Sequence, residues 1–189
     1  MICSKCSNAF DAGEIHSIDT SRNPELKAAV MDGSLFVHKC PHCGKDNLTP
    51  EPVLYHDPER KILIAYTNTP ISSDGLEGYV CRRVASVGDL IEKVKIFESE
   101  MNDIAVELAK FITCQEMKKE VPLKFLKMDG ADGEITLTYP EGGNMEMIVI
   151  GYNVYSDCEG IVSRNPQLQS MAEGLTKVDR DWIAQFIAE

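Results

Sequence analysis

The sequence predicts an α+β fold with a β-rich N-terminal part. Three observations predict it: two Cys-x-x-Cys pairs near the N-terminus, a long segment of helical periodicity at 86–119, and alternating apolar residues after that segment. We expect a zinc-knuckle β-rich part with a short inserted helix, then one long helix, a C-terminal β-hairpin or meander, and terminal helices.

Composition narrows the class of protein. The chain has 189 residues, of which 43% are hydrophobic and 26% charged, as in globular proteins that form one large domain or two small ones. No apolar run approaches the ~18–20 residues that span a bilayer, and the N-terminus lacks the basic and apolar regions of a signal peptide. We therefore expect a cytoplasmic protein with no membrane partner, in which thiols stay reduced.

The charge balance disfavours nucleic acid as a partner. The formal net charge is -11, and a phosphate backbone repels such a protein unless its basic residues gather on one face. The local basic clusters, Arg82-Arg83 and Lys118-Lys119, are small.

Before the second cysteine pair, the chain reads as strand, helix and strand. The segment 9–19 is expected to form a strand. Asn23 is a good N-cap, Pro24 suits the first helical position, and Gly33 is expected to end this short helix. A strand at 34–39 then leads into the second cysteine pair.

A hairpin is expected after the second cysteine pair. Two β-rich runs, "PVLYH" and "KILIAYT", are joined by "DPER", in which Asp-Pro favours a turn. The Gly-, Pro- and Ser-rich segment 68–78 is the best candidate linker. It divides the chain into a zinc-binding part at 1–67 and a part at 79–189 with the long helix, although one continuous domain remains an alternative.

The segment 86–119 is expected to form the long helix. Ser86 and Asp89 resemble a capping box, and Pro122 ends the pattern. Apolar residues recur at alternating spacings of three and four, at Val87, Leu90, Val94, Phe97, Met101, Ile104, Leu108 and Phe111. The stripe is wide, which favours a core helix over a sheet; self-association through 87–111 is the alternative.

The C-terminal part is expected to hold a second hairpin and two helices. The runs "GEITLTY" (133–139) and "NMEMIVIGYNVY" (144–155) flank the turn sequence "PEGG". The helices are expected at 163–174 and at 177–188, the second capped by Thr176. Its apolar face is formed by Val178, Trp182, Ile183 and Phe186.

The four N-terminal cysteines predict one metal site. Two residues between a pair of thiolates let both sulfurs reach one ion, and two such knuckles give a closed tetrahedral site. A redox dithiol needs only one pair, which usually opens a helix. Thiolate cages bind both zinc and iron, and zinc is preferred. The site would therefore hold one structural Zn²⁺ on Cys3, Cys6, Cys40 and Cys43.

Other polar residues offer weaker candidates for a site. His38, His42 and His56 lie near the cysteines in sequence and could replace a ligand. A pocket would draw on Tyr55, His56, Asp57 and Arg83. For Asp57 we prefer a turn, because Asp-Pro is a turn sequence and neighbouring strand residues point apart. The remaining cysteines, Cys81, Cys114 and Cys158, are expected to be small buried residues.

The N-terminal sequence resembles the CpXC domain, a bacterial and archaeal module. The resemblance covers roughly residues 1–125 and rests on both cysteine pairs and on "NPEL", "GSLF", "YHDP" and "LIEKVKIFE". The first pair reads "CSKC" and departs from the family pattern by lacking the proline. The resemblance implies a metal-binding domain with no established activity, and it implies the same four cysteine ligands.

These observations favour a non-catalytic structural or protein-interaction module with an unknown protein partner. A small-ligand-binding protein or enzyme with a pocket near Tyr55, His56 and Asp57 is an alternative. A nucleic-acid-binding zinc ribbon is a further alternative, which the charge disfavours. The chain contains no phosphate-binding loop, nucleophile elbow or zinc-protease motif.

Overall fold

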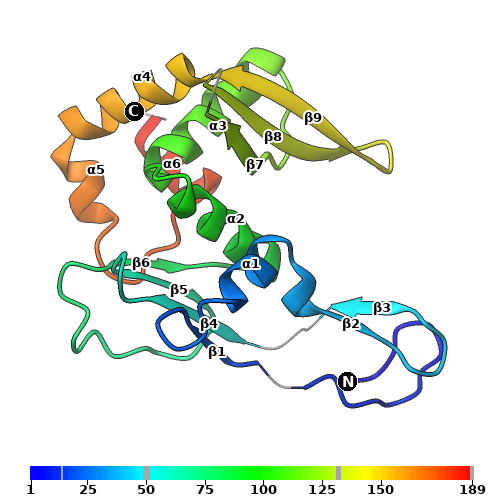
Figure 1. Ribbon diagram of the computed structural model, residues 1–189. Helices are drawn as coiled ribbons and strands as arrows, with labels where there is room; N and C mark the ends of the chain where they lie inside the picture. The colour runs from blue at the N-terminus through cyan, green and yellow to red at the C-terminus, as the bar shows by residue number, and fades with distance from the viewer. Residues whose placement is uncertain (14, 49–51, 131–132, 188–189) are drawn as a thin grey trace. The chain divides into compact units, whose positions relative to one another are not determined.

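The computed structural model describes residues 1–13, 15–48, 52–130 and 133–187. The chain divides into two compact units, Met1–Ile91 and Glu92–Glu189 (Figure 1). Both contain helices and strands, which confirms the α+β class. Among the described residues, no helix is both long enough and apolar enough to cross a membrane.

The first unit contains a four-stranded sheet in the order β1-β4-β5-β6. Its strands are β1 (Ser17–Asp19), β4 (Val53–Asp57), β5 (Ile62–Tyr66) and β6 (Val80–Arg83). Strands β4 and β5 form the expected antiparallel hairpin, while β1 and β6 pair in parallel with β4 and β5. The segment 68–78 connects β5 to β6 within this one sheet, and the boundary between the units follows Ile91.

The strand expected at 9–19 is mostly wrong. Only Ser17–Asp19 form a strand, and Ala9 makes an isolated antiparallel bridge to Ile2. Residue 14 lies outside the described residues. The bridge closes a small N-terminal loop, because its hydrogen bonds are made within the first ten residues, including one from the Phe10 N–H to the Met1 carbonyl.

The inserted helix is shorter than expected. Helix α1 spans Leu26–Met31, and Glu25 occupies its N-cap position without a side-chain hydrogen bond, so the expected Asn23 cap is wrong. Gly33 does end the helix, with a φ of 80°, a conformation that favours glycine. The expected strand at 34–39 begins with a short 3-10 turn, η1 (Ser34–Phe36), before β2 (Val37–Lys39).

The expected single long helix is wrong. It is two helices, α2 (Val87–Glu98) and α3 (Asp103–Met117). Glu100 between them has a left-handed φ of 56°, which no helix interior contains. Asn102 caps α3 by accepting hydrogen bonds from the N–H groups of Ile104 and Ala105, a cap that the apolar spacing conceals.

The second unit holds a three-stranded antiparallel sheet in the order β7-β8-β9. Its strands are β7 (Lys124–Asp129), β8 (Glu134–Glu141) and β9 (Asn144–Gly151), and α3 packs against α4 and α6. The hairpin of β8 and β9 is confirmed, but its second strand stops at Gly151. Residues expected as strand, Tyr152–Tyr155, instead begin helix α4 (Tyr152–Arg164).

The last helices differ from expectation in their limits. Helix α5 spans Pro166–Met171 and helix α6 spans Arg180–Ile187. Asp179 rather than Thr176 accepts a hydrogen bond from the Trp182 N–H, so the expected Thr176 cap is wrong. The expected apolar face is largely confirmed, because Val178, Trp182 and Ile183 are buried in the core of this unit.

The second unit also buries a network of charged side chains, which we call the ion network. Lys93 contacts Asp103 and Glu107 at 3.0 and 3.3 Å. Lys110 contacts Glu92 and Glu107, both at 2.9 Å. All five residues are buried. The network joins α2 to α3, since each lysine binds a carboxylate of the other helix.

Candidate metal centre

The second cysteine pair forms a tight knuckle at the turn of a small hairpin. Strand β2 pairs antiparallel with β3 (Asp46–Leu48), and Cys40–Cys43 lie between them. The Gly44 N–H bonds to the Cys40 carbonyl at 2.9 Å, and the Cys40 N–H bonds to the Lys45 carbonyl at 2.8 Å. Gly44 has a φ of 71°, so it supplies the left-handed exit that the turn requires.

The first cysteine pair repeats this backbone path without proline or glycine. The Ser7 N–H bonds to the Cys3 carbonyl and the Cys3 N–H bonds to the Asn8 carbonyl, both at 3.0 Å. Ser7 has a φ of 58°, the left-handed conformation that Gly44 has in the other knuckle. The departure from the family pattern at "CSKC" therefore leaves the geometry of the knuckle unchanged.

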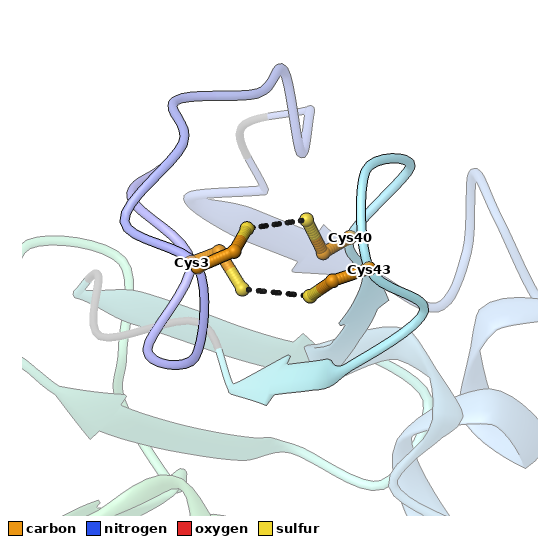
Figure 2. Close-up of side chains that lie close together, drawn as sticks. Cys3, Cys40 and Cys43 are labelled. Carbon is orange, nitrogen blue, oxygen red and sulfur yellow. Dashed lines mark hydrogen bonds between the residues drawn. The ribbon is translucent and has the colours of Figure 1, made fainter.

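The two knuckles bring four sulfur atoms together (Figure 2). The Sγ atoms of Cys3, Cys6, Cys40 and Cys43 all lie within 4.8 Å of one another. Two separations join the knuckles: 3.5 Å from Cys3 to Cys43 and 3.7 Å from Cys6 to Cys40. A tetrahedral site with metal–sulfur bonds of ~2.3 Å has edges of about 3.8 Å. The four sulfurs are thus close enough to bind one metal ion.

The cluster has a buried side and a half-exposed side. Cys3 and Cys40, the first residue of each pair, are each 1% exposed, whereas Cys6 and Cys43 are only half-buried. Burial shields the sulfurs on the inner side from water and competing ligands. The half-exposed sulfurs leave a short path for an ion to enter.

The sulfur atoms differ in how readily they lose a proton. Hydrogen bonding from the N–H groups of Cys6 and Lys5 lowers the pKa of Cys3 to about 6. The Lys45 N–H favours the thiolate of Cys43, but burial and the three neighbouring thiols outweigh it and raise the pKa of Cys43 to about 11. A divalent cation offsets the repulsion among the thiolates, so the cluster suits a metal ion better than four bare charges.

Asn47 supports the cluster from β3, and the sequence did not indicate it. Its side chain is buried, and its amide donates to the Cys3 Sγ at 3.7 Å and to the Lys45 carbonyl at 2.8 Å. N–H···S bonds of this kind orient a thiolate and spread its charge. The signal available in the sequence was an amide side chain three residues after Gly44, in the short run "DNL" that follows "CPHCGK".

The nearby histidines do not join the cluster. Among the described residues, the group of potential ligands that includes the four cysteines contains no histidine. His38 lies in β2 opposite Asn47, and His42 is exposed in the second knuckle. His56 lies in β4 of the larger sheet.

The expected pocket residues point to different sides of the larger sheet. Tyr55 and Asp57 are each 1% exposed, and strand alternation turns His56 to the opposite face. Asp57 accepts hydrogen bonds from the Lys27 side chain at 2.9 Å and from the Arg60 N–H at 3.1 Å, as its turn position predicts. Arg83 donates to the Thr67 carbonyl. The structure therefore does not bring these four side chains together.

The partner of His56 is Asp19, which lies beside it because β1 pairs with β4. The His56 Nδ1 is 3.2 Å from the Asp19 carboxylate, and Nε2 is 3.3 Å from the Tyr79 hydroxyl. The hydrogen bond from the Ser21 hydroxyl, and after it the hydrogen bond with His56, lower the pKa of Asp19 to about 2. No pattern along the chain links residues 19 and 56, so the sequence could not indicate this pair.

The other three cysteines are buried away from the cluster. Cys81, Cys114 and Cys158 are all at most 5% exposed, which confirms their expected role as small core residues. Burial raises the pKa of Cys158 to about 11. Burial also raises the pKa of Cys81, and a thiol buried in apolar surroundings is chemically inert.

One comparison with known proteins found a match. A family model described as "CpXC protein" matches residues 1–110. The resemblance noted in the sequence is thereby confirmed, although the match ends before the expected limit near residue 125. Searches of curated proteins and of solved structures found no match.

Proposed function

The chain belongs to the CpXC protein family, and from that premise and the four-sulfur cluster we propose that it is a zinc-binding protein with a structural metal. The thiolates of Cys3, Cys6, Cys40 and Cys43 would each contribute one bond to the ion. The sulfur separations support this proposal because they are close to the edges of a tetrahedron. Four protein ligands leave no open position for substrate.

Zinc is preferred to iron for a structural reason. Zinc has no redox chemistry and accepts any regular tetrahedron of thiolates, so a closed cage is its usual structural site. An iron centre with the same ligands would serve electron transfer. It would need a redox partner that docks at the half-exposed sulfurs. Colour distinguishes the metals, since Zn²⁺ with a filled d shell has no visible absorption and an iron–thiolate centre is red.

The metal would stabilise the N-terminal part by joining two segments that are weak alone. The hairpin of β2 and β3 has only two short strands, and such hairpins are marginally stable in water. The first knuckle contains the isolated bridge between Ile2 and Ala9 in place of paired strands. Metal binding would therefore supply folding free energy directly.

We propose a non-catalytic role in protein interaction, in the cytoplasm, where the thiols remain reduced. The dispersal of Tyr55, His56, Asp57 and Arg83 supports a binding role over catalysis. Several apolar side chains of 87–111, including Leu90 and Leu108, are buried within the chain itself, so we place the partner's surface elsewhere. The net charge of -11 supports a protein over a nucleic acid.

Metal analysis of the purified protein tests the proposal. We expect one zinc per chain, and replacement by Co²⁺ should give the intense visible absorption of a tetrahedral thiolate site. Cys40→Ser should abolish this spectrum, while the control Cys158→Ala should retain it. A chelator should unfold the N-terminal part, as followed by circular dichroism. A folded, metal-free protein that neither binds cobalt nor responds to chelator would overturn the proposal.

A heparin column tests the alternative nucleic-acid role. At physiological salt the zinc-loaded protein should flow through, because its negative charge opposes binding to a polyanion. Retention would contradict the assignment of a protein partner and favour the zinc-ribbon alternative.

A further inference from the structure

Strand β9 is an edge strand of the three-stranded sheet in the second unit. It lies at the end of the order β7-β8-β9, and every residue from Asn144 to Gly151 pairs with β8. Its other side faces no described strand of the chain. Figure 1 shows β8 and β9 extending from the helices of the second unit as a long hairpin.

Apolar side chains cover both faces of this edge strand. On one face, Met145, Met147 and Val149 are 63%, 67% and 52% exposed. On the other face, Ile148 and Ile150 pack against the core but are only partly buried. A strand added beside β9 would bury the outer flank of these side chains on both faces.

The opposite edge of the same sheet is protected, and the contrast is informative. Strand β7 carries Lys124 and Lys127, and its pairing with β8 is interrupted by an irregularity between Phe125 and Lys127. Lysines and bulges are the usual means by which proteins block edge-to-edge pairing. Strand β9 contains no lysine or proline, and its register with β8 is continuous. One edge is closed to an added strand, and the other is open to it.

We propose that β9 pairs antiparallel with β9 of a second copy of this chain. In the register that places Met147 opposite its own counterpart, Met145 lies opposite Val149. The single charged residue of the strand, Glu146, then lies opposite Ile148. On the exposed face, Met145, Met147 and Val149 therefore meet only apolar residues of the second copy, and no like charges lie directly opposite each other on either face. The two sheets join through this two-fold contact into one.

The interface is small, so the dimer is weak and depends on concentration. Pairing of two eight-residue strands buries less than the ~800 Å² per partner of a standard interface. A dissociation constant on the order of micromolar or weaker follows. Each copy carries a formal charge of -11, and salt screens the repulsion between copies. Dimerisation therefore strengthens with added salt, the reverse of an interface held by ion pairs.

Sedimentation equilibrium of the zinc-loaded full chain tests the proposal. The mass of the wild type should rise from monomer to dimer as the concentration approaches about 0.5 mM, and more readily in added salt. Met147→Lys places two lysines opposite each other and should weaken the dimer about tenfold or more. Met171→Lys is the control, because Met171 is similarly exposed at 56% but lies in α5. It should dimerise as the wild type does.

Hydrogen exchange locates the contact. Amides in 144–151 should become more protected as the wild-type concentration rises, and those of the Met147→Lys variant should not. Unchanged zinc content and Trp182 fluorescence show that the variant is folded, and keep this test separate from that of the metal site. A wild type that stays monomeric, a Met147→Lys variant that dimerises normally, or a Met171→Lys variant that loses the dimer overturns the proposal.

Discussion

Asn47 holds Ser4 by two hydrogen bonds to a single oxygen. The Asn47 side-chain carbonyl accepts from the Ser4 backbone N–H at 2.9 Å and from the Ser4 hydroxyl at 3.0 Å. The same side chain donates to the Cys3 sulfur and to the Lys45 carbonyl. One residue of β3 therefore joins the first knuckle to the second, in addition to any metal ion.

Replacing this link should weaken metal binding. Asn47→Ala removes the N–H···S bond and leaves the Ser4 N–H without its partner, so we expect the affinity for the metal to fall by about 10- to 100-fold. Competition with a chromophoric chelator measures the change. The matched control is Asn8→Ala, since Asn8 bonds to Cys3 through its backbone carbonyl, which the substitution keeps. An unchanged affinity in Asn47→Ala would remove Asn47 from the site.

Breaking the ion network should destabilise the second unit strongly. Lys110→Met leaves the carboxylates of Glu92 and Glu107 buried with fewer partners, which costs about 3–5 kcal/mol. Urea unfolding followed by Trp182 fluorescence measures the loss, because Trp182 is the single tryptophan and is buried in this unit. The control Lys127→Met breaks an exposed pair with Asp129 and should cost less than about 1 kcal/mol. Equal losses would contradict the assignment.

The same network should make stability depend on pH. Burial alone would raise the pKa of Glu92, but Lys110, Lys124 and the Phe125 N–H outweigh it and lower that pKa from its usual value of 4.5. At pH values between the pKa of Glu92 in the folded state and its higher pKa in the unfolded state, the unfolded state binds more protons. The free energy of unfolding therefore falls as the pH falls below about 4.5. The stability difference between wild type and Glu92→Gln should therefore be largest near neutral pH and should shrink in acid. A difference that is constant with pH would contradict this account.

The break between α2 and α3 should tolerate glycine better than glutamate. Glu100 has a φ of 56°, a conformation that costs a non-glycine residue roughly 1–2 kcal/mol. Glu100→Gly removes this cost but raises the conformational entropy of the unfolded chain, so we expect a net stabilisation of up to about 1 kcal/mol. The control Glu98→Gly lies at the end of α2 and should destabilise by up to about 1 kcal/mol. Thermal unfolding measures both, and destabilisation by Glu100→Gly would contradict the prediction.

Features with local causes were predictable from the sequence. The spacing of Cys40 and Cys43 with Gly44 after them predicts a knuckle, because its hydrogen bonds connect residues only a few positions apart. The hairpin of β4 and β5 follows from its turn sequence. The end of helix α1 at Gly33 follows from the position of this glycine after a helical stripe. The break at Glu100 was missed because the apolar spacing continues across it, and only the cap at Asn102 indicates a new helix.

The sequence by itself determined that two cysteine knuckles exist and that each can offer two thiolates. Only the tertiary structure decided that the four sulfurs meet, that Asn47 supports them, and that Asp19 rather than Asp57 lies beside His56. The physical reason is the range of the interactions. A turn is specified by the torsion preferences of adjacent residues. Which distant segments pair and pack together depends on the whole core, and no periodic pattern in the sequence indicates it.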